Sequence, residues 1–72
     1  MSRTVVTQPI ILGHAVKAAR RARGLTQIQL ADAVGAYPRA IIDIERGRSG
    51  ADMKLILDVV SQVGLQLVLE PQ

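Results

Sequence analysis

The side chains of this chain that could do chemistry are cations rather than nucleophiles or metal ligands. His14 is the only histidine, and the sequence contains no cysteine. The acidic residues are scattered, so no pair of carboxylates is placed for general acid–base catalysis. The glycines are dispersed and form no phosphate-cradling loop. We therefore expect no enzymatic activity and no cofactor or metal, and we expect His14 to lie on a helix surface.

The cations are concentrated in the first two thirds of the chain. Residues 1–48 carry eight Lys or Arg and three acidic residues, a net charge of +5, whereas residues 49–72 carry one Lys and three acidic residues, a net charge of −2. Lysine and arginine bind polyanions because they neutralise phosphates and release condensed counterions. The charge pattern favours a nucleic-acid partner for the first part, with a solvated basic face as the alternative.

Local signals within the basic part predict two short helices joined by a tight turn. Thr26 and Gln29 have the spacing of a capping box, so the first of these helices should begin at Gln27. Gly35 should end that helix in the left-handed conformation. Pro38 then suits the first turn of the second helix.

Small and apolar positions in residues 27–46 indicate how these two helices pack. Ala31 lies where the second helix should cross the first, and a larger side chain would hold the backbones apart. The positions predicted to face the core are Leu30, Val34, Ala36, Ile41 and Ile44. Capping box, turn glycine, small crossing residue and apolar stripes together predict a DNA-reading helix-turn-helix rather than a generic helical hairpin.

Two further helices should surround this motif. One is expected over residues 9–23, and its inward stripe is Leu12, Ala15, Val16 and Ala19. The other is expected over residues 52–63, where Asp52 suits the positive end of the helix dipole and Gly64 follows the end. Its inward stripe is predicted to be Met53, Ile56, Leu57, Val60 and Val63. Leu55 and Val59 should form a second apolar face that exceeds what one small domain covers.

After this last helix the apolar pattern changes to the alternation of a β-strand. A lone strand is unstable, so we expect it to pair with the same strand of a second chain, alone or flanked by residues 4–7. A chain of 72 residues also gains stability from oligomerisation. The sequence therefore predicts a homodimer. Its dimerisation residues are Leu65, Leu67 and Leu69.

No secretion signal or membrane span is predicted. The segment MSRTVVTQPIILG is too short and is interrupted by Pro9 and Gly13. The lack of cysteine fits a reducing compartment, and we expect a cytoplasmic, nucleoid-associated protein. The expected organisation is one domain over residues 1–72, with a helical core over 9–63 and a dimerisation strand and tail over 64–72.

The segments LTQIQLADAVG and IIDIERG resemble the core motif of the Xre-type helix-turn-helix proteins, which include small phage repressors. The resemblance covers roughly residues 12–63 and implies an all-α, lambda-repressor-like domain of four helices. The tail VGLQLVLE adds a short C-terminal dimerising β-strand, as in the HipB-type antitoxins. In that subfamily the antitoxin dimer represses its own operon and holds a HipA-like kinase toxin inactive.

The resemblance also implies which residues meet DNA. Gln27 would contact a phosphate at a helix N-terminus. Arg39 stands where the family places a base reader, and it would bind guanine bidentately, with a phosphate contact as the alternative. Tyr37 replaces the usual Ser or Thr cap, so its ring would touch the DNA backbone or a thymine methyl. The full set of expected DNA-contacting residues is Gln27, Tyr37, Pro38, Arg39, Ile42, Asp43, Arg46, Arg48 and Ser49.

Two more of these residues, besides Tyr37, depart from the family pattern. Asp43 can only accept hydrogen bonds, so it suits cytosine N4 and is repelled by phosphate. Ile42 would meet a thymine methyl or pack against the following loop. Arg46, Arg48 and Ser49 are expected to be phosphate ligands, with a solvated loop as the alternative.

The resemblance further implies a structural ion pair. In several phage repressors the positions that match Arg20 and Glu45 form a partly buried pair that joins the first helix to the third. Removal of either partner would leave an uncompensated charge.

Two function classes remain open. The first is a DNA-binding repressor of a palindromic operator, either a HipB-like antitoxin or a free-standing, phage-repressor-like regulator. The second is a helix-turn-helix module that binds proteins and does not read DNA. Tyr37, Ile42 and Asp43 favour the second class, whereas the basic half of the chain favours the first.

Overall fold

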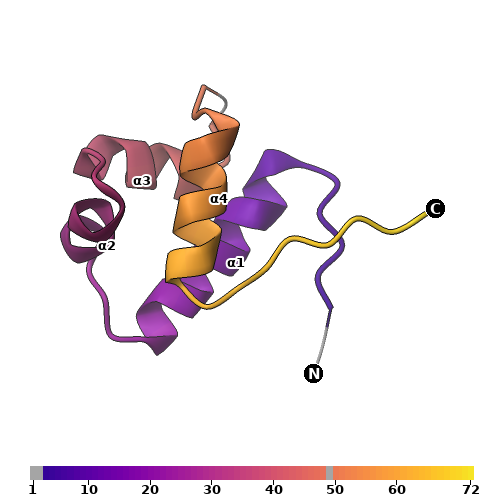
Figure 1. Cartoon of the computed structure of the whole chain (residues 1–72), viewed down its shortest axis with the longest axis horizontal. Helices are drawn as coiled ribbons and strands as arrows, with labels where there is room; N and C mark the ends of the chain where they lie inside the picture. The colour runs from indigo at the N-terminus through magenta and orange to yellow at the C-terminus, as the bar shows by residue number, and fades with distance from the viewer. Residues whose placement is uncertain (1–2, 49) are drawn as a thin grey trace.

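The computed structural model describes residues 3–48 and 50–72, and these residues form four α-helices and no strand. The helices are α1 (Pro9–Ala22), α2 (Gln27–Val34), α3 (Pro38–Glu45) and α4 (Met53–Gln62). α3 packs against both α1 and α2, and α2 also packs against α4 (Figure 1). No helix in the described ranges is long and apolar enough to cross a membrane.

Side-chain caps define where α2 and α4 begin. Thr26 Oγ1 accepts a hydrogen bond from the Gln29 backbone N–H at 3.0 Å, and Gln29 Oε1 accepts one from the Thr26 N–H at 2.9 Å. This is the predicted capping box. Asp52, which the sequence placed near the positive end of α4, caps that helix directly, since its Oδ1 accepts from the Leu55 N–H at 2.8 Å.

All four helices of the described residues end in the same hydrogen-bonding pattern. After α3, the Gly47 N–H donates to the Ile44 carbonyl at 3.1 Å and the Arg48 N–H donates to the Asp43 carbonyl at 2.9 Å. Gly47 has a φ of 73°, which is the left-handed conformation that this Schellman motif requires. The equivalent glycines after the other three helices are Gly24, Gly35 and Gly64.

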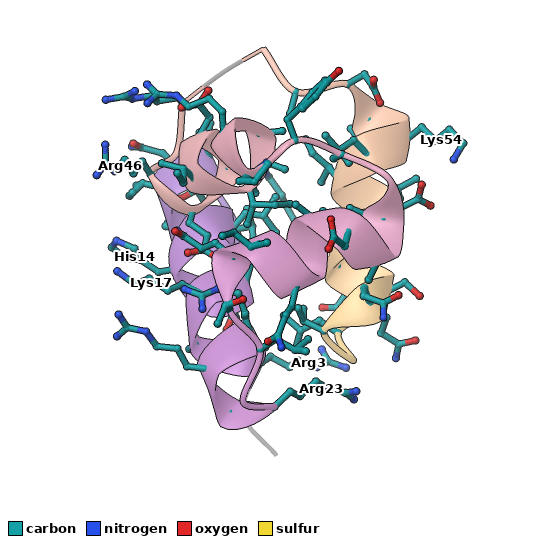
Figure 2. The ribbon with its side chains drawn as sticks, turned by 90° about the vertical axis from the view of Figure 1, so that its left-hand side faces the viewer. Arg3, His14, Lys17, Arg23, Arg46 and Lys54 are labelled. Carbon is teal, nitrogen blue, oxygen red and sulfur yellow. The ribbon has the colours of Figure 1, made fainter. Side chains whose placement is uncertain are left out.

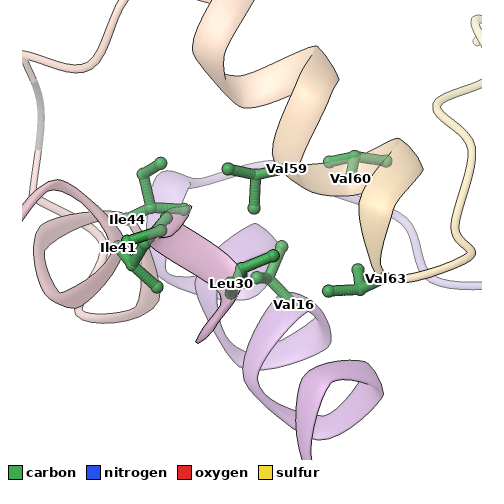
Figure 3. Close-up of a cluster of buried hydrophobic side chains, with 8 residues drawn as sticks. Val16, Leu30, Ile41, Ile44, Val59, Val60 and Val63 are labelled. Carbon is green, nitrogen blue, oxygen red and sulfur yellow. The ribbon is translucent and has the colours of Figure 1, made fainter. Parts of the chain in front are cut away.

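The core receives side chains from every helix (Figure 3). Its buried members are Val16, Leu30, Ala31, Ile41, Ile44, Val59, Val60 and Val63. The prediction for α4 was wrong in part, because Met53 and Leu57 are 64% and 48% exposed whereas Val59 is fully buried. Apolar residues cover more than one face of α4, so its periodicity did not define the inward face. The contact of α4 with α2 defines it instead.

The predicted C-terminal β-strand is absent from the described residues. The segment after α4 runs back past the N-terminal segment (Figure 1), and an ion pair joins Arg3 to Glu70. A strand requires a backbone ladder with a neighbour, and in the described residues no backbone hydrogen bond joins the tail to the N-terminal segment. Leu65, Leu67 and Leu69 are consequently exposed.

Candidate nucleic-acid interface

The third helix has one buried face and one face in solvent. Ile41, Ile44 and Glu45 are buried on the inner side of α3. The Arg39 side chain, in the first turn, is 66% exposed, and the Asp43 side chain is 35% exposed. α3 is therefore packed onto α1 and α2 while its polar side remains accessible to a partner.

A buried ion pair anchors the C-terminal end of α3 to α1. Arg20 Nε donates to Glu45 Oε2 at 2.6 Å, and Arg20 Nη2 donates to Glu45 Oε1 at 3.1 Å. Arg20 Nη1 also donates to the Leu25 carbonyl at 2.8 Å. The two residues are only 7% and 4% exposed. Such bidentate, charge-assisted pairing sets the orientation of both helices.

Gln27 joins the same buried network. Its Nε2 donates to Glu45 Oε1 at 3.1 Å, so the start of α2 is tied to the end of α3. The sequence assigned Gln27 to a phosphate contact, and no sequence signal indicated this bond. The amide carries a second N–H, and the first backbone N–H groups of a helix have no intrahelical acceptor. A phosphate contact at this helix start thus remains a prediction.

α1 and α3 approach closely at two glycines. A Cβ on Gly13 would lie 2.6 Å from the Glu45 carbonyl oxygen, and one on Gly47 would lie 2.6 Å from the Ile10 Cα. Both distances are too short for any other residue without a backbone shift. The packing role of Gly13 cannot be predicted from the sequence, because a glycine within a helix carries no local signal for a contact.

Asp43 lies between two arginines on the exposed side. Its Oδ1 is 3.2 Å from Arg39 Nε and 3.4 Å from Arg48 Nη1. From the sequence, these three residues are expected to be separate DNA contacts. The structure brings them into one cluster, which we call the Arg39–Asp43–Arg48 cluster.

The other expected contact residues surround this cluster. Tyr37 is 84% exposed and forms no side-chain cap bond to α3. Pro38 and Arg46 are exposed, and Ile42 is half-buried. Ser49 lies outside the described residues.

Lys17 of α1 adds a cation to the side of the molecule that carries Arg46. Figure 2 shows His14 and Lys17 of α1 projecting on the same side as Arg46, which follows α3, and Lys54 of α4 on the opposite side. The sequence shows that residues 1–48 are basic, but Lys17 is not among the predicted site residues. The side of the molecule that carries the end of α3 is therefore basic.

Two consecutive short helices, α2 and α3, joined by a tight turn at Gly35, with the outer side of α3 accessible, define a helix-turn-helix domain. The family model described as helix-turn-helix matches residues 16–68, and the chain belongs to this family, in its Xre type. Helix-turn-helix domains are binding modules and not enzymes. A comparison with curated proteins gave no match.

Several solved structures are similar to the chain. A chain of the HipA–HipB–O2–O3 complex superposes with a TM-score of 0.84 at 22% identity, over 96% of this chain and 97% of that one. The clp gene regulator ClgR from Corynebacterium glutamicum has a TM-score of 0.72 at 25% identity, over 93% and 85% of the two chains. A second ClgR structure has a TM-score of 0.71 at 26% identity, over 89% and 67%.

Proposed function

We propose that the protein is a sequence-specific DNA-binding repressor that inserts α3 into the major groove. The observation that carries this proposal is the division of α3 into two sides. Glu45 is held inside by Arg20, while Arg39 in the first turn is 66% exposed. A recognition helix of this motif reads base edges with its N-terminal residues, so a rigidly seated helix with an exposed arginine at that end suits direct readout.

We assign contacts to the surrounding residues from their positions in the fold. Arg39 reads guanine through O6 and N7, and Arg46 and Gln27 contact phosphates on either side of the groove. Tyr37 and Pro38 lie at the start of α3 and Ile42 lies in its second turn, and we assign them contacts to the DNA backbone or to a thymine methyl. Arg48 and Ser49 follow α3, and we assign them to phosphates on the basis of the sequence.

We further propose that the protein acts as a homodimer. Met53 and Leu57 leave apolar surface exposed on α4, and the leucines at 65, 67 and 69 are exposed beside them along the chain. A second copy would supply the backbone partner that turns this segment into a β-strand. A two-fold dimer places two recognition helices in successive major grooves, roughly 34 Å apart, and so requires a palindromic operator.

The antitoxin hypothesis rests on the fit to a chain of the HipA–HipB–O2–O3 complex. That similarity extends over 96% of this chain, including most of the tail. We propose that the protein is a HipB-like antitoxin that represses its own operon and binds a HipA-like kinase toxin. Since α3 must remain free for DNA, the toxin would contact the outer faces of α1 and α4 and the tail. The similarity to ClgR, a gene regulator, favours a free-standing regulator as the second candidate.

Selection from a random duplex library tests the central proposal. The protein should enrich a palindromic sequence with two half-sites about one helical turn apart. Enrichment of no sequence, by a folded protein, would identify a helix-turn-helix module that does not read DNA. Enrichment of single half-sites without a partner site would contradict the dimer.

A further inference from the structure

We propose that Asp43 determines specificity by holding Arg39 and Arg48 away from the phosphates of non-cognate DNA. This proposal rests on the proposed DNA-binding function and deepens it. The carboxylate Oδ1 is 3.2 Å from Arg39 Nε and 3.4 Å from Arg48 Nη1. One carboxylate oxygen is thereby paired with two arginines that would otherwise be available to the phosphates of any duplex.

The backbone builds this arrangement. Arg39 and Asp43 are four residues apart on α3, which places their side chains on the same side of the helix. Arg48 lies beyond the end of α3, but the left-handed turn at Gly47 directs its N–H to the Asp43 carbonyl at 2.9 Å. Asp43 therefore binds Arg48 both through its backbone carbonyl and through its carboxylate. The turn that ends α3 therefore also helps to build the Arg39–Asp43–Arg48 cluster.

Charge explains why the effect discriminates between sequences. For Arg39 or Arg48 to reach a phosphate, its ion pair must break and the Asp43 carboxylate must remain beside the negatively charged groove. Non-cognate DNA offers the Asp43 carboxylate no hydrogen-bond donor that would compensate for the broken ion pair. A cytosine N4 amino group beside the guanine that Arg39 reads would donate to the carboxylate, which releases Arg48 to a phosphate. Asp43 thus weakens non-cognate binding more than cognate binding.

The test compares Asp43→Asn with a matched control, Asp58→Asn. Asp58 also accepts from a cation four residues away, Lys54 Nζ, at 2.8 Å. That hydrogen bond, together with the attraction between the two charges, raises the pKa of Lys54. Both variants therefore remove one negative charge and one ion pair between residues four apart within a helix, but Asp43→Asn also removes the pair with Arg48, and Asp58 is on α4. Circular dichroism melting verifies that each variant is folded.

The probes are the duplex that the wild-type protein enriches from a random library and a scrambled duplex of the same composition. For Asp43→Asn we expect affinity for the scrambled duplex to rise about three- to tenfold, the range that two exposed ion pairs allow. The slope of log affinity against log salt should steepen by about two, because two arginines gain phosphate contacts. The ratio of cognate to scrambled affinity should fall at least about threefold, and Asp58→Asn should leave that ratio unchanged.

A second background separates the cluster from simple charge removal. In the variant Arg39→Ala, Arg48→Ala, the gain that Asp43→Asn gives on scrambled DNA should shrink to the part that loss of one negative charge gives by itself. Persistence of the full gain there would overturn the proposal, as would an unchanged affinity ratio or a loss confined to the cognate duplex. That last result would make Asp43 only a base reader. Failure of the wild-type protein to enrich any duplex would overturn the proposed function together with this one.

Discussion

Arg20 and Glu45 join α1 to the end of the recognition helix through two hydrogen bonds inside the molecule, at 2.6 and 3.1 Å. Glu45 also accepts from Gln27, so a single carboxylate holds three helices together. None of the buried side-chain N or O atoms in the described residues lacks a hydrogen-bond partner. The orientation of α3 therefore depends on a complete buried polar network.

Breaking this network from one side should be strongly destabilising. Glu45→Gln leaves the Arg20 guanidinium buried without its counter-charge, and we expect a loss of about 3–5 kcal/mol in the free energy of unfolding, measured by urea denaturation. Gln27→Ala removes a single hydrogen bond and should cost only about 1 kcal/mol. The double variant Arg20→Met, Glu45→Leu should recover much of the free energy of unfolding that Glu45→Gln loses, because neither buried charge remains. A loss below about 1 kcal/mol for Glu45→Gln would show that the pair is not a structural anchor.

Gly13→Ala should destabilise the fold, although alanine is the better helix former. In an open helix this exchange would stabilise by about 1 kcal/mol. Here the new methyl group would overlap the Glu45 carbonyl oxygen, and the overpacking should cost about 1–3 kcal/mol. The sign of the shift in melting temperature tests this prediction. A higher melting temperature for Gly13→Ala would mean that α1 and α3 are not in close contact.

Arg39→Ala and Arg46→Ala should affect DNA binding differently. Loss of Arg39 should cost about 1–3 kcal/mol at one base position and relax specificity there. Loss of Arg46 should weaken all sequences to a similar extent and reduce the salt slope by about one. Binding isotherms on the enriched duplex and its single-position variants measure both effects. An equal loss on every sequence for Arg39→Ala would assign Arg39 to a phosphate.

Removal of the residues after Val63 should abolish the dimer. The truncated chain keeps α1 to α4, so it should sediment as a monomer or aggregate through its exposed apolar surface. Leu67→Asp in the 72-residue chain is a milder change than truncation and should shift the monomer–dimer equilibrium toward monomer. An intact dimer of the truncated chain would place the interface on the helices alone.

Co-purification of the native operon products tests the antitoxin hypothesis. A HipA-like kinase should be retained with the protein, and Arg39→Ala should leave this association unchanged because the proposed toxin surface excludes α3. Recovery of only the 72-residue chain, still bound to its own promoter DNA, would instead identify a free-standing repressor.

Local signals in the sequence determined the boundaries of the helices. Thr26 and Gln29 lie three residues apart, and Gly35 follows the helix that they cap, so the start and end of α2 depend on atoms within one turn. The charge of the first 48 residues likewise indicated a polyanion partner without any knowledge of the fold. The Arg20 and Glu45 pair was expected only through a family resemblance, because no local rule joins residues 25 positions apart.

The tertiary structure decided the features that depend on which faces meet. Leu57 and Val59 are both apolar, and only the packing of α4 onto the core that the other helices form determines that Val59 is buried. Gly13 became a contact point because α3 happens to cross α1 there, and Asp43 became the centre of a cluster because the turn at Gly47 returns the chain. Hydrogen bonds between neighbouring residues are encoded by spacing. Contacts between helices depend on how all the apolar surfaces are buried at once, and this is a property of the whole chain.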